Sequence, residues 1–342
     1  MMNDELKTVR CPLSVASGPL FVATQIAQHK QLSTDDGQRT VPRSAFRFPR
    51  FFYLWLLVGL LACATAVVAQ EGARGRVEYT KFQSQSLGRE VNCAISLPPS
   101  YDREAKRRYP VLIFLHGLFN NERDWEERGM QARLEELRAA GKVGDFIVAV
   151  PYGANSFYLN GKDGTRYEDA IVNDFIPFVD QTYRTIGTAR GRAIEGISMG
   201  GYGALLIAFK YPQKFTAVAA HSAALFEELP KPPAQSSDGR GRFRYELAAK
   251  LFGSPYDVQY FQDNNPLQLA KANAAKIRNL KIYFDVGEQD RYGFDAGNRQ
   301  LDATLTAAGI KHEFHPAPGE HGWSFLLSRS TEALTFDWNA LR

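Results

Sequence analysis

The segment 196–200 (GISMG) places a serine between two glycines in the pattern G-x-S-x-G. Such a serine can act as a nucleophile on an acyl carbonyl, provided that a base takes its proton. We expect glycine to be required at Gly196 and Gly200, because a side chain there would collide where a strand and a helix nearly touch. The pattern alone also arises by chance in glycine-rich turns, so the rest of the chain must supply an acid and a base.

Asp290 and His321 are the residues that fit these two roles. Each follows an expected strand, at the edge of a sheet where the active sites of α/β proteins form. The chain order Ser198, Asp290, His321 is that of the α/β-hydrolases. We predict that His321 takes the proton of Ser198 and that Asp290 orients His321.

Other acids and histidines offer weaker alternatives. Glu288 lies slightly early along the same loop as Asp290, and Asp285 falls inside a strand pattern, so that it would point along the sheet. His221 ends the strand that follows the serine and could line the site. His116 belongs to a His-Gly turn, where a histidine more often braces the loop by hydrogen bonding.

Two backbone amides are candidates for stabilising the charge that develops on the substrate oxygen. Met199 begins a helix, so that its amide points to where an oxyanion would form. Leu118 follows the His-Gly turn after an apolar run, and its amide is the expected second donor.

The elements that must position these residues alternate between strand and helix patterns. Strands are predicted at 111–115, 146–150, 192–197, 215–221, 280–286 and 311–315, of which the first is a continuous apolar run and the last alternates. Helical spacing predicts helices at 130–140, 167–183, 202–211, 298–308 and 323–341. A hairpin is expected over 77–85 and 90–97. This alternation predicts an α/β fold with a mostly parallel central sheet and helices on both faces.

The segment 223–266 interrupts the alternation. Its part 229–239 (LPKPPAQSSDG) has the composition of a loop, and 244–251 predicts a short helix. A connection this long between strands is usually functional or mobile, so we interpret it as a lid-like insertion over the active site. A surface excursion without a role is the alternative.

The first 69 residues differ from the body of the chain. Residues 51–69 carry no charge and follow three arginines, which is typical of a signal peptide cleaved before Gln70. The run could also span a bilayer, so an uncleaved membrane anchor is the alternative. The polar segment 1–50 is interpreted as a disordered leader or an over-extended gene model, with the true start at Val41. Residues 70–342 are then one exported domain, which is secreted, periplasmic or anchored outside the membrane.

Charge and cysteine content limit the other classes of function. The chain has 41 basic and 37 acidic residues. Most of the basic excess falls before residue 70 and the body is near neutral, so nothing suggests a nucleic-acid partner. Cleavage would leave Cys93 alone, which predicts a buried small hydrophobic residue and no intramolecular disulfide. No cluster has the spacing of metal ligands, since His312 and His315 are too few, so we expect no metal or cofactor.

Four strings in order resemble one esterase family. They are 115–118 (LHGL) with the downstream Trp125, then 196–204 (GISMGGYGA), 287–290 (GEQD) and 321–323 (HGW). That family groups esterase D (S-formylglutathione hydrolase), feruloyl and acetyl-xylan esterases, and the antigen 85 mycolyltransferases. The resemblance covers most of residues 75–340. It implies the α/β-hydrolase fold, a Ser198–His321–Asp290 triad and oxyanion amides at Leu118 and Met199.

The resemblance also guides the expected substrate. Segment 156–158 (SFY) is similar to one that borders the acyl site in secreted members, and we predict substrate contacts at Trp125, Tyr158, His221 and Trp323. The expected function is an exported serine esterase that acts through an acyl-enzyme on small esters or on acyl or feruloyl groups of a glycan.

Three alternatives remain open. A thioesterase like S-formylglutathione hydrolase is disfavoured by export, because glutathione thioesters are cytosolic. An acyltransferase like the mycolyltransferases is disfavoured by the polar composition of the lid-like insertion. A non-catalytic binding module is disfavoured because the chain keeps all three residues of the triad.

Overall fold

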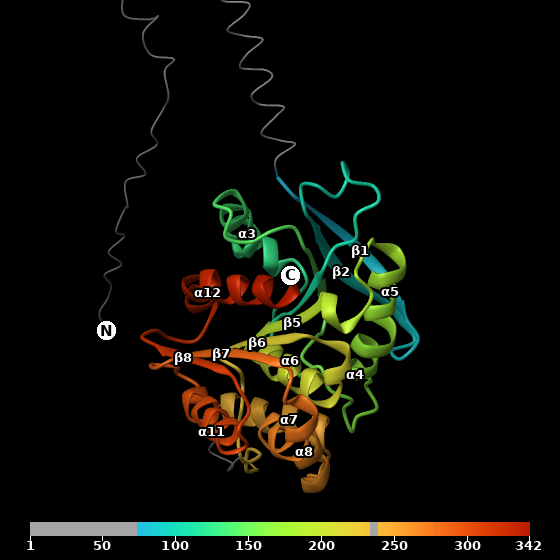
Figure 1. Ribbon diagram of the computed structural model, residues 1–342. Coiled ribbons are helices and arrows are strands. Elements are labelled where there is room, and N and C mark those ends of the chain that lie inside the picture. Colours follow the sequence, from blue (N-terminus) through green and yellow to red (C-terminus); the bar gives the residue numbers. More distant parts are fainter. Residues whose placement is uncertain (1–73, 233–238) are drawn as a thin grey trace, which may run out of the picture. The chain divides into compact units, whose positions relative to one another are not determined.

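An eight-stranded sheet runs through the part of the chain that the computed structural model describes, residues 74–232 and 239–342 (Figure 1). Its strand order is β1-β2-β4-β3-β5-β6-β7-β8. The strands are β1 (Arg76–Ser84), β2 (Arg89–Leu97), β3 (Val111–Leu115), β4 (Ile147–Pro151), β5 (Arg192–Ile197), β6 (Ala217–His221), β7 (Lys281–Gly287) and β8 (Glu313–Ala317). β1 and β2 form the predicted hairpin, and β2 pairs antiparallel with β4. All later pairs are parallel, which confirms the predicted sheet.

Helices cover both faces of this sheet, as predicted. They are α2 (Asp124–Glu127), α3 (Met130–Ala139), α4 (Tyr167–Asp169), α5 (Ile176–Thr182), α6 (Met199–Lys210), α7 (Gly239–Phe252), α8 (Val258–Asn264), α9 (Pro266–Ala272), α10 (Ala274–Ile277), α11 (Phe294–Ala307) and α12 (Trp323–Leu341). In Figure 1, α3 and α12 lie on one side of the sheet, and α6, α7, α8 and α11 lie on the other. The sheet therefore lies between two layers of helices, and the ends of its strands lie between these layers.

The central strand β3 shows why the sheet is buried on both faces. Its five residues are all apolar and buried, and successive side chains point to opposite faces of a strand. Val111, Ile113 and Leu115 join the cluster that contains α6. Leu112 and Phe114 join the cluster that contains α3 and α12. A continuous apolar run is therefore the pattern that this position in the sheet requires.

Local boundaries differ from the prediction where tertiary contacts decide them. The helix expected over 167–183 is divided by a π-helical turn, Ala170–Phe175, between α4 and α5. β8 starts two residues later than predicted, because its register is set by parallel pairing of Glu313 with Tyr283. Cys93 is buried on β2 as expected, and burial raises its pKa to about 12.

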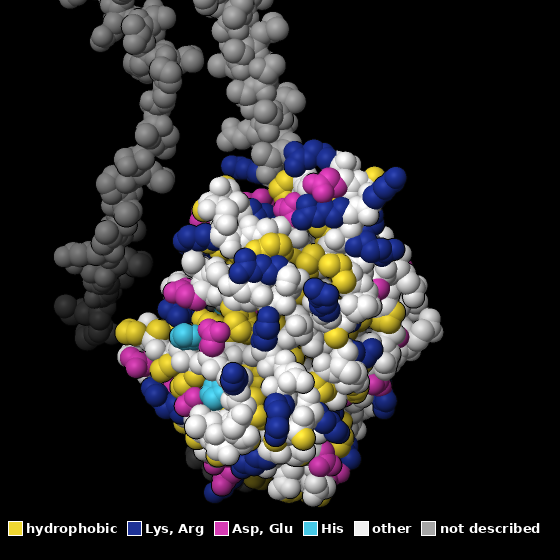
Figure 2. All heavy atoms as spheres, in the orientation of Figure 1, with side chains coloured by type: hydrophobic (Ala, Val, Ile, Leu, Met, Phe, Trp, Pro, Cys, Tyr) yellow, Lys and Arg dark blue, Asp and Glu magenta, His cyan; other side chains and the backbone are white. Residues whose placement is uncertain are grey.

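Several expectations concern residues outside those described. The polar leader 1–50 and the signal peptide or anchor at 51–69 fall there. Among the described helices, none combines the length and the apolar character that crossing a bilayer requires. On the face in Figure 2, lysine and arginine side chains are scattered over the surface rather than gathered into one band.

Candidate active site

Ser198 occupies a strained turn between β5 and α6. Its φ of 57° and ψ of −115° lie where residues other than glycine rarely occur, as in a nucleophile elbow. Its N–H donates to the carbonyl of His221 at 2.8 Å, and its own carbonyl accepts from the amides of Tyr202 and Ala224, both at 3.0 Å. These bonds hold the strained backbone in place, so that the hydroxyl faces away from the sheet.

The two glycines beside Ser198 have no room for a side chain. A Cβ atom on Gly200 would lie 1.9 Å from the carbonyl oxygen of Leu115. A Cβ atom on Gly196 would lie 2.2 Å from the carbonyl oxygen of Gly200. Both neighbours are backbone atoms, so this is the collision between strand and helix that the sequence pattern predicts.

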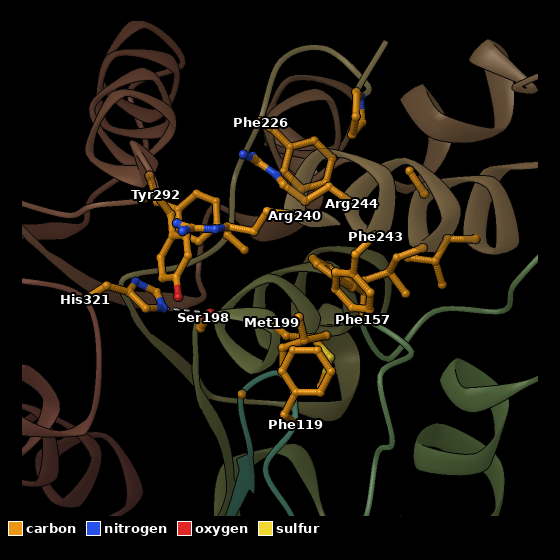
Figure 3. A pocket seen from close by; sticks show the side chains of 18 of the residues that line it. Phe119, Phe157, Ser198, Met199, Phe226, Arg240, Phe243, Arg244, Tyr292 and His321 are labelled. Carbon is orange, nitrogen blue, oxygen red and sulfur yellow. Dashed lines mark hydrogen bonds between the residues drawn. The ribbon is translucent and has the colours of Figure 1, made fainter. Parts of the chain in front are cut away.

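Ser198, His321 and Asp290 form a chain of hydrogen bonds, and Figure 3 shows the bond between Ser198 and His321. Nε2 of His321 lies 2.9 Å from Oγ of Ser198, and Nδ1 of His321 lies 2.8 Å from Oδ2 of Asp290. The other oxygen of Asp290 accepts from the amide of Tyr292 at 2.9 Å. The rings of Tyr292 and Phe294 meet the imidazole at nearly right angles, with centroids 4.8 and 5.4 Å away. The histidine is thus held by a carboxylate and by two aromatic rings.

The two alternative acids lie elsewhere. Asp285 is buried within β7 and bonds to His221 rather than to His321. Glu288 is exposed, and its carboxylate lies 3.9 Å from the guanidinium of Arg299. Geometry therefore singles out Asp290 as the carboxylate that orients His321.

His116 braces the loop that carries Leu118. Its Nδ1 lies 2.8 Å from the carbonyl oxygen of Gly117, and its Nε2 accepts from the amide of Gly153 at 2.8 Å. Burial lowers the pKa of His116 to about 4, so the ring is neutral and can accept at Nε2. Leu118 and Met199 both line the cavity at Ser198, which is where the two predicted oxyanion amides must lie.

Of the four predicted substrate contacts, the structure brings only Trp323 to the cavity. Trp125 is buried in the cluster that contains α3 and α12, and its Nε1 donates to Gln131 at 2.9 Å. Tyr158 is also buried, and its hydroxyl donates to the carbonyl of His116 at 3.2 Å. His221 lies inside the sheet, with Asp285. These three predictions are corrected: the side chains point into the protein, where packing rather than position along the chain decides their direction.

A cavity of about 800 Å³ opens above Ser198. Much of its wall comes from the segment that was predicted to be a lid. Apolar residues of the wall include Leu118, Phe119, Phe157, Phe226, Phe243, Leu247, Ala248, Leu251, Phe252 and Phe294. The polar composition of the insertion therefore did not predict the apolar character of the cavity, because its helix α7 turns an apolar face towards the cavity.

Sequence reasoning missed most of these wall residues, although one signal was present. Phe243, Leu247 and Leu251 are spaced four residues apart, which places them on one face of a helix. The predicted helix began at residue 244, whereas α7 begins at Gly239 and includes Phe243. Phe119 and Phe226 lie in loops, where no periodicity marks the direction of a side chain.

A buried cluster of charged side chains surrounds His221, whose carbonyl accepts from the amide of Ser198. The imidazole of His221 bonds through Nδ1 to Asp285 at 3.0 Å and through Nε2 to Glu195 at 2.9 Å. Burial alone lowers the pKa of His221, but the charge of Asp285 and the bonds to both carboxylates raise it to about 10. Burial and the charge of Glu195 raise the pKa of the nearby Asp337 well above its usual range. His221 is therefore a buried cation between two carboxylates.

This cluster predicts how stability changes with pH. The pKa of His221 is about 10 in the folded protein and about 6.5 when unfolded, so its contribution is complete below pH 6.5 and is lost towards pH 10. Ionisation of Asp337 as the pH rises acts in the same direction, because its charged form is disfavoured in the folded protein. We expect the free energy of unfolding, measured by urea denaturation, to fall over this interval.

His221→Gln should show whether this cluster is responsible. Removing a buried cation from between two carboxylates should lower the free energy of unfolding by about 3–5 kcal/mol at pH 6. The variant should also lose most of the decline between pH 6.5 and 10. His315→Gln, at an exposed histidine, should change neither quantity. A flat stability profile in the unmodified protein would contradict the assignment.

Comparison with known proteins agrees with the geometry of the site. Residues 84–328 match the family described as "Putative esterase". The chain belongs to this esterase family. Two relatives illustrate it. An acetyl esterase of Caldicellulosiruptor saccharolyticus is 31% identical over 231 residues, which are 67% of this chain and 82% of the relative. An endo-1,4-beta-xylanase/feruloyl esterase of Xylanibacter ruminicola is 32% identical over 149 residues, 41% of this chain.

This member of the esterase family spans only part of some relatives. The match covers 20% of the length of the xylanase/feruloyl esterase and 56% of esterase Rv1288 of Mycobacterium tuberculosis, which is 28% identical over 72% of this chain. A solved ferulic acid esterase superposes with a TM-score of 0.67 at 25% identity, covering 78% of this chain and 98% of the other. The fold is that of the α/β-hydrolase esterases, as the resemblance implied.

Proposed function

We propose that this chain is a serine esterase that hydrolyses carboxylic esters through an acyl-enzyme. The observation that carries the proposal is the hydrogen-bonded chain Ser198–His321–Asp290 at the floor of a cavity of about 800 Å³. Membership of the esterase family supports it independently. We further propose that residues 51–69 direct the export of the domain or anchor it at a membrane.

The reaction follows from the position of each group. Oγ of Ser198 attacks the acyl carbonyl carbon while Nε2 of His321 takes its proton, and Asp290 stabilises the imidazolium that forms. The same nitrogen then gives the proton to the leaving alcohol. Water enters, loses a proton to His321 and attacks the acyl-enzyme, which releases the acid and restores Ser198.

The amides of Leu118 and Met199 are proposed to bind the oxygen that becomes negative in each tetrahedral intermediate. Both residues border the serine, and Met199 is the first residue of α6, where an amide has no partner within the helix. Each such donor contributes about 3 kcal/mol to lowering the barrier. His116 and its two hydrogen bonds position the loop of Leu118.

The cavity favours an acyl group larger than acetyl. Its aromatic wall suits an aromatic acyl group, such as the feruloyl group named for two of the similar proteins, or an alkyl chain of moderate length. Burying each added CH₂ is worth about 0.8 kcal/mol, or roughly a fourfold gain in kcat/KM, until the cavity is full. The chain-length profile therefore measures how much of the cavity the acyl group fills.

The test is hydrolysis of p-nitrophenyl esters from acetate to decanoate, together with a feruloyl ester, by the full chain. We expect kcat/KM to rise from acetate to an optimum at longer chains, and we expect the feruloyl ester to be cleaved. Ser198→Ala serves as the control for background hydrolysis. A folded protein that cleaves none of these esters would contradict the proposal.

A transferase is the second candidate, because the apolar wall removes the argument against a long acyl group. It would pass the acyl group from Ser198 to an alcohol instead of water. Adding an alcohol acceptor during turnover separates the two reactions. A transferase would form the new ester in preference to the free acid, whereas an esterase would release mainly acid.

A further inference from the structure

The cavity above Ser198 is divided into two parts of different chemistry. In Figure 3, Phe119, Phe157 and Phe243 gather on one side of Ser198, and His321 and Tyr292 lie on the other. The rings of Phe119 and Phe243 lie with their centroids 5.3 Å apart. Phe119 is 70% exposed, which is unusual for a phenylalanine and leaves its ring free to contact a ligand.

Basic side chains dominate the charged lining of this cavity. Lys231, Arg240, Arg244 and Arg291 line it, and Glu228 is the one acidic residue among the described residues that do so. In Figure 3 the guanidinium of Arg240 extends across the cavity towards Tyr292, and that of Arg244 extends towards Phe226. Within the described ranges, neither of these two exposed arginines takes part in an ion pair.

The placement of Arg240 and Arg244 is energetically unfavourable when no anion is bound. Arg240 and Arg244 are four residues apart on α7, and like charges at this spacing destabilise a helix. Both arginines border an apolar cavity, where a charge interacts more strongly than in open water. A guanidinium can hold a carboxylate or a phosphate through two parallel hydrogen bonds. An anionic group on the ligand would offset the repulsion and use both donors.

The position of His321 decides which end of the ester carries the anion. In the proposed reaction Nε2 of His321 gives a proton to the leaving alcohol, so the alcohol must lie on the side of His321. The acyl group then lies on the opposite side, against the phenylalanines. Arg240 extends towards the alcohol side, as Figure 3 shows.

We propose that the natural substrate is an ester of an apolar acyl group with an anionic alcohol, whose carboxylate or phosphate binds Arg240 and Arg244. The inference rests on the proposed esterase function and specifies its substrate class. A sugar bearing a carboxylate and a phosphorylated alcohol share this chemistry.

The first test compares two esters that differ only in charge on the leaving group, para-acetoxybenzoate and para-acetoxybenzamide. The ratio of their kcat/KM values is measured for the full chain and for the double variant Arg240→Gln, Arg244→Gln. Comparing ratios between proteins cancels the intrinsic reactivity of the esters. We expect the ratio to fall about tenfold in the double variant, since two exposed ion pairs, each of modest strength, are lost together.

Three controls make the result specific. Arg242→Gln removes a charge from the same helix at a residue that does not line the cavity, and it should leave the ratio unchanged. Salt at about 1 M should reduce the preference of the unmodified chain, because exposed charges are then screened within a few ångströms. The mono-p-nitrophenyl ester of succinic acid, which carries its charge on the acyl side, should gain nothing over p-nitrophenyl butyrate.

The outcomes separate the inference from the proposed function. Equal ratios in the unmodified chain and the double variant, or an equal fall in Arg242→Gln, would overturn the inference and leave the esterase in place. If the folded protein cleaves neither these two esters nor any of the p-nitrophenyl and feruloyl esters, the esterase proposal fails, and binding decides the inference. Titration calorimetry of Ser198→Ala with galacturonate, glycerol phosphate and uncharged galactose provides that measurement.

Each ligand in this titration has a defined meaning. Tighter binding of galacturonate than of galactose assigns a carboxylate, and tighter binding of glycerol phosphate assigns a phosphate. Either preference should disappear when Arg240 and Arg244 are also replaced. Binding of both anions no tighter than that of galactose would overturn the inference.

Discussion

Ser198→Ala is expected to lower kcat for ester hydrolysis by a factor of about 10⁴ to 10⁶. Alanine keeps the backbone and removes the one oxygen that lies 2.9 Å from Nε2 of His321. No acyl-enzyme can then form, and the remaining rate comes from water that the oxyanion amides and His321 assist. Steady-state hydrolysis of p-nitrophenyl butyrate measures the loss, and trapping with a fluorophosphonate shows whether the covalent adduct disappears.

Asp290→Asn completes this test by leaving the nucleophile in place. The side-chain NH₂ of asparagine can donate a hydrogen bond to Nδ1 of His321, which leaves the imidazole proton on Nε2. In this tautomer Nε2 cannot take the proton of Ser198, and kcat should fall by about 10⁴. Ser324→Ala, at an exposed serine close to His321 in the chain, should retain full activity. Substantial hydrolysis by folded Ser198→Ala would mean that another residue is the nucleophile.

Gly200→Ala is expected to destabilise the protein by more than about 3 kcal/mol or to prevent folding, because overpacking against rigid neighbours is costly. Its Cβ atom would lie 1.9 Å from the carbonyl oxygen of Leu115 and 2.8 Å from that of His116. Leu115 ends β3 and pairs with Gly196 of β5, so it cannot move without disrupting the centre of the sheet. Helix propensity alone predicts the opposite sign, a gain of about 1 kcal/mol.

Steric overlap and helix propensity predict opposite changes in the free energy of unfolding, so Gly200→Ala distinguishes between them. Gly239→Ala, at the first residue of α7, adds a methyl group with no atom within 4 Å, and it should change the free energy of unfolding by less than about 1 kcal/mol. Urea denaturation followed by circular dichroism measures both variants. A Gly200→Ala protein as stable as the unmodified chain would show that strand and helix can separate at the elbow, against the steric account.

The hydrophobic pattern predicted most of the strands because burial constrains them locally. A strand such as β3, covered by helices on both faces, must be apolar at every position, and this is visible as a continuous run. The helix Trp323–Leu341 was predicted with the same limits, because its apolar spacing is uninterrupted. The π-helical turn at Ala170–Phe175 was not predictable, since it inserts into a pattern that reads as one helix.

The residues that form the candidate triad could also be recognised in the sequence. Only a few residue types can act as nucleophile, base and acid, and their order along the chain matches the order in which strands of this fold end. Gly196 and Gly200, beside Ser198, lie against backbone atoms of neighbouring segments, so no larger residue fits at either position. Residue type and order thus determined the fold class and the three residues of the candidate triad.

Tertiary structure decided which side chains meet. Asp285, Glu288 and Asp290 are within six residues of one another, and only packing turned the last of them towards His321. Packing likewise turned Trp125 and Tyr158 into the core and placed Arg240 and Phe243 at the cavity. The physical reason is that the direction of a side chain in a loop or on an inserted helix depends on contacts with residues distant in the chain, which local pattern and composition do not contain.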